Sequence, residues 1–410
     1  MVCARLCRFD AVLCVLLNNM KRVLVHFVTL CLFACCSSNK VDSGLSEEEL
    51  NHLNLEKSPL YTTKDEASEI IPLDGAFGDR VREIDNLLDT LYFLPLQTDV
   101  DHVFYGIFKM IVSRDRIFIR DYDDRLLIFD RNGMFVNELM LGQGPGEIFQ
   151  LYDFAFDDKD QNLVVAQPNM LNYYNKDGVF VTSKPCPIIS WEFAVLNNGF
   201  FFVQPQFVND YLGDDARYSA IITSDDIRVA GRGIPIGHTE GLVRHLNYTF
   251  AEGGSHILSI PGNDTIYEVS DSDIKAKYIL DFHENETRCI GNGEFDKPDN
   301  FYHSSGFLEN SQTQFFYFNS PKNGSYSIIR DRKSKKMLGA SYFMSSPDVV
   351  PMCCANIKTV YDDYFVSYID PYSGMHYSTP AVSDKDNDKV KNLTDEDNAV
   401  LVFFKLKTLE

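Results

Sequence analysis

Two stretches of the chain decide its fold, because they are copies of one pattern: residues 117–136 are IFIRDYDDRLLIFDRNGMFV and residues 163–181 are LVVAQPNMLNYYNKDGVFV. Each contains two apolar runs joined by a polar turn, then an Asx-Gly pair and a third apolar run. Gly133 and Gly178 are 45 residues apart. Asn-Gly and Asp-Gly pairs are typical of tight hairpin turns. A unit of this kind, at this period, has the size of one β-propeller blade.

Weaker copies of the same strand follow along the chain. Counted with the two clear copies, they bring the number of units to six, at an average spacing of about 49 residues. The sequence therefore predicts an all-β fold, a six-bladed β-propeller. The four weaker strand cores are residues 200–203, 256–260, 315–318 and 364–368.

Two strand-like segments remain outside these units, residues 91–96 before the first and residues 400–406 at the end of the chain. Pairing them in one blade would close the ring and leave neither as a bare edge. We therefore expect the propeller to be closed by pairing of an N-terminal with a C-terminal strand.

Composition limits the function classes. Of 410 residues, 45% are hydrophobic and 24% charged, as in an ordinary globular protein. The formal net charge is −21, which argues against nucleic acid as a partner.

The first 34 residues are predicted to be a signal peptide that is removed. A short basic segment ends at Arg22, and an apolar run over residues 23–34 is too short to span a membrane. Cys35 then follows a lipobox-like Leu-Phe-Ala, which predicts lipidation of Cys35 and a start at Met20 preceded by an over-extended reading frame. The alternative is an uncleaved anchor helix over residues 11–34.

Residues 35–77 are polar and acidic, and we interpret them as a flexible tether that carries the lipidated cysteine. The propeller is then expected over residues 78–410, with one short helix over residues 80–88. The cysteines of the predicted body show no metal-site spacing, so buried free thiols are favoured, with disulfide pairing left open. These are Cys186, Cys289, Cys353 and Cys354.

The segment 128–133, continuing to GQGPGE at residues 142–147, resembles a bacterial family of six-bladed β-propeller lipoproteins, and more distantly NHL- or TolB-like propellers. Residues 92–96 (YFLPL) and 397–401 (DNAVL) are similar to the segments that flank the blades in that family, with Ala399 where Pro is usual. The resemblance implies a lipid-anchored propeller at the cell envelope, on the outer membrane or the periplasmic side. It implies no particular activity.

The glycine-rich segment 142–147 could cradle a phosphate, but strand-like residues flank it and no lysine follows. We favour a tight connection between two blades. In an up-and-down blade this connection shares a rim with the turns at residues 121–125 and 167–169, and such a rim can bind ligands. The residues predicted to contact a ligand there are Asp121, Arg125, Gln143, Glu147 and Gln167.

No metal, cofactor or catalytic residue is predicted. Residues 384–395 place aspartates as a calcium-binding loop does, but Lys389 replaces the required glycine, so an acidic linker fits better. His-Glu-x-x-His and Gly-x-Ser-x-Gly are absent from the sequence.

These observations favour a non-catalytic module that binds a glycan, a peptide or an envelope protein, tethered to the membrane through Cys35. The alternative is a carbohydrate-active hydrolase or lyase with carboxylates around the central channel, which the sequence leaves open. A third hypothesis is a structural subunit of an envelope complex.

Overall fold

The structure is a computed structural model, and the chain divides into two compact units, residues 1–46 and residues 47–410. All elements below belong to the second unit. The predicted signal peptide and Cys35 lie outside the described residues. The structure describes residues 46–409, apart from 62–66, 100, 191, 205–207, 237–248, 251–255, 292–293, 345–356, 372–375 and 377–380.

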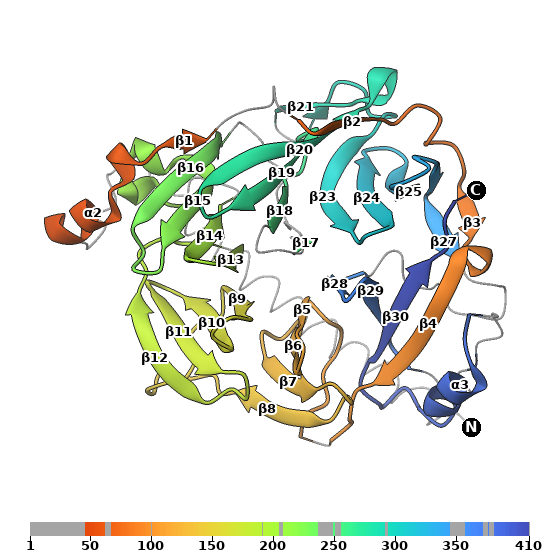
Figure 1. The fold of residues 1–410 in the computed structure, drawn as a ribbon, viewed down its shortest axis with the longest axis horizontal. Helices are drawn as coiled ribbons and strands as arrows, with labels where there is room; N and C mark the ends of the chain where they lie inside the picture. The colour runs from red at the N-terminus through yellow and green to blue at the C-terminus, as the bar shows by residue number, and fades with distance from the viewer. Residues whose placement is uncertain are drawn as a thin grey trace, which may run out of the picture. The chain divides into compact units, whose positions relative to one another are not determined.

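The second unit is a six-bladed β-propeller, as the sequence predicts (Figure 1). Blade 1 contains β5 (Lys109–Val112), β6 (Arg116–Arg120), β7 (Leu126–Asp130) and β8 (Phe135–Leu139); blade 2 contains β9 (Asp153–Asp157), β10 (Asn162–Gln167), β11 (Met170–Asn175) and β12 (Phe180–Pro185); blade 3 contains β13 (Glu192–Leu196), β14 (Gly199–Val203), β15 (Tyr218–Ser224) and β16 (Val229–Pro235).

The second half of the ring has the same design, with antiparallel strands running from the axis outward. Blade 4 contains β17 (Thr249–Phe250), β18 (His256–Ser259), β19 (Thr265–Ser270) and β20 (Asp273–Asp281); blade 5 contains β23 (Tyr302–Glu309), β24 (Thr313–Ser320), β25 (Gly324–Asp331) and β26 (Met337–Ala340); blade 6 contains β28 (Thr359–Tyr361), β29 (Tyr364–Ile369), β30 (Val400–Leu406) and β4 (Leu88–Pro95).

Blade 6 closes the ring by the predicted strand pairing. β30, near the C-terminus, pairs antiparallel with β4, which precedes blade 1. Phe403 lies opposite Tyr92 in the register, and their rings stack 4.7 Å apart. The six predicted strand cores are all confirmed, and each is the second strand of its blade, from β6 in blade 1 to β29 in blade 6.

The second strands are apolar throughout because both faces of each blade are buried. In β6, Ile117 and Ile119 pack toward blade 6, whereas Phe118 packs toward blade 2. Successive side chains of a strand point to opposite faces, so one run of apolar residues serves two interfaces. The buried core accordingly consists of six clusters, one between each pair of neighbouring blades.

The start of the folded body differs from the predicted boundary at residue 78. The segment assigned to the tether contains α2 (Glu47–Leu53), η1 (Leu55–Lys57), β1 (Leu60–Tyr61) and β2 (Glu69–Pro72). β1 pairs parallel with β16, and β2 pairs parallel with β20. Strands of two and four residues leave almost no periodic signal, because most of their stabilisation comes from pairing with a distant strand.

The predicted helix over residues 80–88 is wrong. That segment forms β3 (Val81–Glu83), the 3-10 turn η2 (Asp85–Leu87) and the start of β4. β3 pairs parallel with β27 (Tyr342–Met344), so tertiary pairing overrides the local pattern. Conversely, the acidic segment near residue 384 forms the short helix α3 (Asp384–Val390), which begins with a Ser383 cap that accepts the Asp386 N–H. The remaining elements are η3 (Asp210–Leu212), η4 (Asp214–Ala216), η5 (His283–Asn285), β21 (Cys289–Gly291) and β22 (Glu294–Phe295).

Candidate functional site

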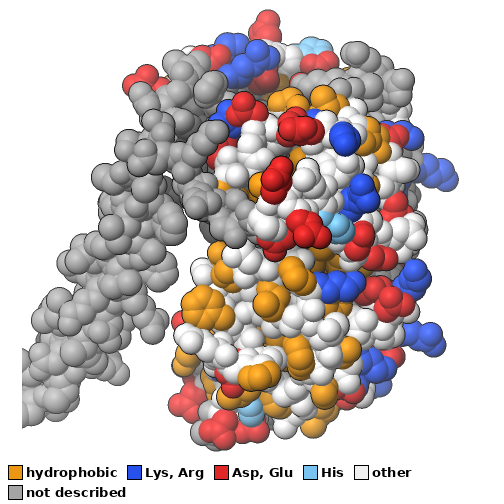
Figure 2. All heavy atoms as spheres, turned by 90° about the vertical axis from the view of Figure 1, so that its left-hand side faces the viewer, with side chains coloured by type: hydrophobic (Ala, Val, Ile, Leu, Met, Phe, Trp, Pro, Cys, Tyr) orange, Lys and Arg blue, Asp and Glu red, His pale blue; other side chains and the backbone are white. Residues whose placement is uncertain are grey.

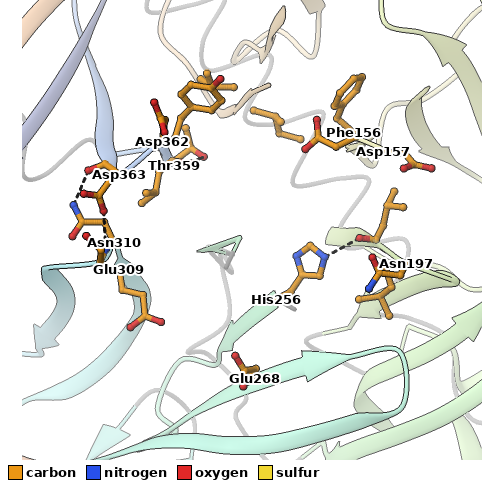
Figure 3. Close-up of a pocket in the computed structure, with 18 of the residues that line it drawn as sticks. Phe156, Asp157, Asn197, His256, Glu268, Glu309, Asn310, Thr359, Asp362 and Asp363 are labelled. Atoms are coloured by element: carbon orange, nitrogen blue, oxygen red, sulfur yellow. Dashed lines mark hydrogen bonds between the residues drawn. The ribbon is translucent and has the colours of Figure 1, made fainter. Parts of the chain in front are cut away.

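A cavity of about 600 Å³ lies on the axis of the propeller, where the first strand of each blade turns into the second. We call this end the cavity rim. Each blade supplies at least one side chain, so the site depends on the closed ring (Figure 3). From blade 1 to blade 6 these include Val112, Phe156, Asn197, His256, Glu309 and Thr359.

Glu309 is the most constrained carboxylate of the cavity. It ends β23, and its Oε1 accepts a hydrogen bond from Lys277 Nζ of blade 4 at 2.7 Å. Its Oε2 accepts from the Tyr278 hydroxyl at 2.9 Å and from Gln314 Nε2 at 3.0 Å. Burial alone would raise the pKa of Glu309, but Lys277, Gln314 and Arg332 outweigh burial, so its pKa lies below the usual range. Glu309 is therefore ionised and links blade 4 to blade 5.

A second link joins blades 5 and 6 at the same rim. Asn310 Nδ2 donates to the backbone carbonyl of Asp363 at 2.9 Å, and the Ser311 N–H donates to Asp363 Oδ1 at 2.8 Å (Figure 3). Burial raises the pKa of the Asp363 carboxyl, but contacts with Ser311 and Lys405 outweigh it and lower the pKa. Asp363 therefore stays ionised and holds the wall of the cavity in place.

Two further carboxylates of the cavity, Asp158 and Asp362, are exposed to solvent. Within the described residues, neither side chain has a hydrogen bond or ion pair, in contrast to Glu309 and Asp363. Although Asp158 reaches solvent, its carboxyl group is partly buried, and this partial burial, helped by the charge of Asp157, raises its pKa. Asp158 and Asp362 thus have acceptor capacity left for a ligand.

His256 stands at the start of β18 and its side chain is buried in the wall of the cavity. Its Nε2 lies 2.8 Å from the Val195 carbonyl oxygen, so this nitrogen carries the proton that is donated (Figure 3). Burial lowers the pKa of His256, which keeps the ring neutral near pH 7. The histidine joins blade 4 to blade 3.

The residues predicted from sequence lie at the other end of the propeller. The turn over residues 121–125 follows β6, and β6 runs antiparallel to β5, so this turn is at the end opposite the cavity rim. The connection 140–152 and the turn 168–169 share that end, which we call the connection rim. None of the five predicted side chains lines the cavity.

Most of the predicted residues make contacts that stabilise turns. Asp121 is buried, caps its own turn and pairs with Arg125 Nε at 2.8 Å. Glu147 accepts the Gly144 N–H at 2.7 Å, and Gln167 accepts the Phe149 N–H at 2.6 Å. Gln143 is exposed. The glycine-rich segment is therefore a tight connection between blades, as favoured above, while a ligand contact at these residues stays a prediction.

Sequence reasoning missed the cavity residues. The acidic segment at residues 157–160 predicts a hairpin turn, with a calcium site as the less favoured alternative, and Asp157 and Asp158 do form the turn between β9 and β10. The available signal was positional: each residue follows the first strand of a blade, and these positions converge at one end of the axis in a closed ring.

Neither a metal site nor a membrane span is found in the described part of the chain. No group of three or more His, Cys, Asp or Glu side chains there could hold a metal ion. Among the described helices, none has the length and hydrophobicity to cross a bilayer. Cys186 is a buried free thiol, and burial raises its pKa to about 12.

Comparison with known proteins identifies the family. The chain is similar to the crystal structure of a candidate exported protein from Bacteroides fragilis, with 18% identity and a TM-score of 0.65 over 83% of this chain and 100% of that one. Likeness at this identity shows the shared fold alone. A DUF4221 family member from Bacteroides vulgatus is 10% identical, with a TM-score of 0.43 over 79% of this chain and 100% of that chain. A search of curated proteins found no match.

The model of one protein family, described as a domain of unknown function, DUF4934, matches residues 68–405. This range begins at β2 and ends within β30, so it contains every blade and both strands that close the ring. The predicted likeness to a propeller family is confirmed at this level, whereas NHL-like character and lipid attachment stay predictions. The chain belongs to the DUF4934 family.

Proposed function

We propose that this chain is an exported, lipid-anchored and non-catalytic binding module, whose central cavity takes a small ligand rich in hydrogen-bond donors. The observation that carries the proposal is the cavity itself, about 600 Å³ in volume and lined by all six blades. Concave sites of this size, with a few convergent polar groups, are typical of small-molecule binding.

The charge pattern supports a ligand that donates hydrogen bonds. Glu309 and Asp363 are already satisfied by neighbouring blades, whereas Asp158 and Asp362 keep their acceptor capacity. An ionised carboxylate accepts only, so its partner must donate. Sugar hydroxyls, amines and guanidinium groups share this property.

Glu309 and Asp363, the two carboxylates that join neighbouring blades, favour binding over the hydrolase alternative. A glycoside hydrolase needs one carboxyl group as an acid beside a second as base or nucleophile. Two of the inner carboxylates, Glu309 and Asp363, have lowered pKa values and hold blades together. Such groups fit a structural role.

The ligand is tested by a thermal-shift screen of the purified protein against monosaccharides, amino acids and polyamines. We expect at least one compound to raise the unfolding temperature, and to lose this effect in an Asp158→Asn/Asp362→Asn variant. Mass spectrometry of the recovered compound should find it unchanged. Turnover of a bound compound, or the same shift in the variant, would overturn the proposal.

Export and lipid attachment rest on the Leu-Phe-Ala-Cys sequence that ends at Cys35. The similar protein from Bacteroides fragilis, a candidate exported protein, supports the same location. Metabolic labelling with palmitate in a bacterial host tests it: label should enter the wild-type chain and be absent from a Cys35→Ser variant. Equal labelling of both chains, or of neither, would contradict a lipid at Cys35.

A further inference from the structure

The outer edges of blades 3 and 4 are covered by the N-terminal segment of the same chain. β1 adds to β16 with Leu60 opposite Arg232, and the Arg232 N–H donates to the Pro59 carbonyl at 3.1 Å. β2 adds to β20 over four residues, and its Ile71 is fully buried against the blade. In both cases an extended segment runs parallel to the outermost strand of a blade. Two blades of this propeller therefore carry a fifth strand at their outer edge.

Three other outer strands are also in contact with covering segments. The Arg82 Nε–H donates to the Gly339 carbonyl of β26, and Lys389 of α3 donates to the Phe93 carbonyl of β4. In blade 1, the Gln97 side chain accepts the Phe135 N–H at the start of β8. The rule in this molecule is that outer strands are covered by a neighbouring part of the chain.

β12, the outer strand of blade 2, departs from this rule. Like β8, β26 and β4, it is the last strand of its sheet, but in the described part of the chain no covering segment forms a hydrogen bond with its backbone. Five of its six residues are exposed, whereas β8 and β26 contain only buried and half-buried residues. Val181 is 56% exposed, and Val179 just before the strand is 59% exposed. An uncovered edge of this length is a template for another strand.

The first four residues of β12 are uncharged, and the strand ends with Lys184, whose Nζ donates to the Asp225 carbonyl at 3.1 Å, and Pro185. Residues 179–183 are Val-Phe-Val-Thr-Ser, rich in side chains that favour strands, in a chain of net charge −21. Gly146 of the neighbouring connection lies directly against the Phe180 ring, and that connection adds three exposed side chains, Met140, Leu141 and Phe149. Figure 2 shows hydrophobic side chains over the middle of the lower half of this face, with charged ones along its margins and over the upper half.

We propose that β12 binds an extended, uncharged segment of a partner protein, which adds to blade 2 as a fifth strand. The site continues the row of outer edges that β1 and β2 already cover in the next two blades of the ring. The backbone of the partner supplies the ladder of hydrogen bonds, and its alternate apolar side chains pack inward as Ile71 does in blade 4. The surface is separate from the cavity rim.

Selection from a display library of random dodecapeptides, with the purified full chain as bait, tests the proposal. We expect enriched peptides to be uncharged and rich in Val, Ile, Thr and aromatic residues. On binding, such a peptide should slow amide hydrogen exchange over residues 180–185. A library that yields no binder, or a binder that protects another strand instead, would overturn the proposal.

A matched pair of variants identifies the edge. Val181→Lys places a charge on the exposed edge of β12, and we expect it to weaken the selected peptide at least tenfold. Ile70→Lys makes the same kind of change on β2, where Ile70 is 62% exposed, and should leave peptide affinity unchanged. Equal affinity for Val181→Lys and wild type would contradict the assignment. If sedimentation shows a wild-type dimer that Val181→Lys dissolves, the occupant is a second copy and the proposal of a separate partner is wrong.

Discussion

The two rims of the propeller are built from the same strands but differ in what their polar side chains do. At the connection rim, Asp121, Glu147 and Gln167 are occupied by backbone N–H groups of their own turns and connections. At the cavity rim, the satisfied carboxylates link different blades, and Asp158 and Asp362 remain available. The comparison teaches that a polar turn residue becomes a candidate ligand contact only when its own loop does not use it.

The difference follows from the topology of a blade. Connections between blades leave the outer strand and return to the axis, so they are long and need internal hydrogen bonds to stay ordered. The turns at the cavity rim join the two innermost strands and are short. Their side chains therefore converge on the axis and can meet a ligand.

Both rims depend on closure of the ring, which gives the largest expected effect. Deletion of residues 398–410 removes β30 and leaves β4 and β29 without their partner. The deletion removes seven buried side chains from the two clusters that flank blade 6, so we expect the cooperative thermal transition followed by circular dichroism to disappear. Unchanged unfolding of the truncated chain would show that closure does not hold the two rims together.

Removing a turn carboxylate should lower the free energy of unfolding more at the connection rim than at the cavity rim. Asp121→Ala removes the carboxylate partner of Arg125, which keeps its bond to the Val103 carbonyl, and leaves two turn N–H groups without an acceptor, so we expect the free energy of unfolding to fall by about 3 kcal/mol. Asp158→Ala at the cavity rim should change it by less than about 0.5 kcal/mol, as for other exposed positions. Urea denaturation of both variants checks this. A similar fall in the free energy of unfolding in both variants would contradict the difference between the two rims.

Acid should destabilise the protein through buried histidines at either rim. Burial lowers the pKa of His303 to about 4, and an unfolded histidine titrates near 6.5. Between these values the unfolded state binds a proton that the folded state excludes. Stability therefore falls as pH falls from about 6.5 to 4, by about 1.4 kcal/mol per pH unit for this residue. His256, whose pKa is also lowered, acts in the same direction.

The measurement is urea denaturation at pH 7, 6 and 5 for wild type and His303→Gln. The variant is expected to start less stable, because His303 is fully enclosed, but to show a smaller loss per pH unit. A slope equal to that of wild type would mean that His303 is protonated in the folded state as well.

Gln143 at the connection rim should give the smallest effect. Its side chain is exposed, and its glycine-rich connection is held by Glu147 instead. We expect Gln143→Ala to change the free energy of unfolding by less than about 0.5 kcal/mol. A larger fall in the free energy of unfolding, measured by urea denaturation, would mean that the Gln143 side chain makes a stabilising contact.

The fold could be predicted because its determinants are local and repeated. Gly133 and Gly178 each adopt a positive φ in their turns. The side chains of Asp130 and Asn175 accept the N–H groups of these two turns. Their 45-residue spacing gives the blade, and the unpaired segments at the two ends give the closure. β1 and β2 were not predicted, because strands of two and four residues are stabilised mainly by the strands with which they pair, β16 and β20.

The cavity could not be predicted for a related reason. Glu309 and Lys277 are 32 residues apart and belong to different blades. Asp158 belongs to blade 2, whereas Asp362 belongs to blade 6. No spacing rule connects such residues. A ligand site was predicted at the connection rim because its glycine-rich segment is contiguous in sequence. That segment is contiguous because its residues form hydrogen bonds with one another that hold the connection in place.

The most direct test of ligand binding at the cavity rim is isothermal titration of one ligand, the best compound from the thermal-shift screen, into three proteins. Wild type and Gln143→Ala should bind with the same Kd within about twofold, and Asp158→Asn/Asp362→Asn should bind at least tenfold more weakly, equivalent to about 1.4 kcal/mol. If the double variant binds as wild type does while Gln143→Ala loses affinity, the ligand sits at the connection rim, which contradicts the assignment made here.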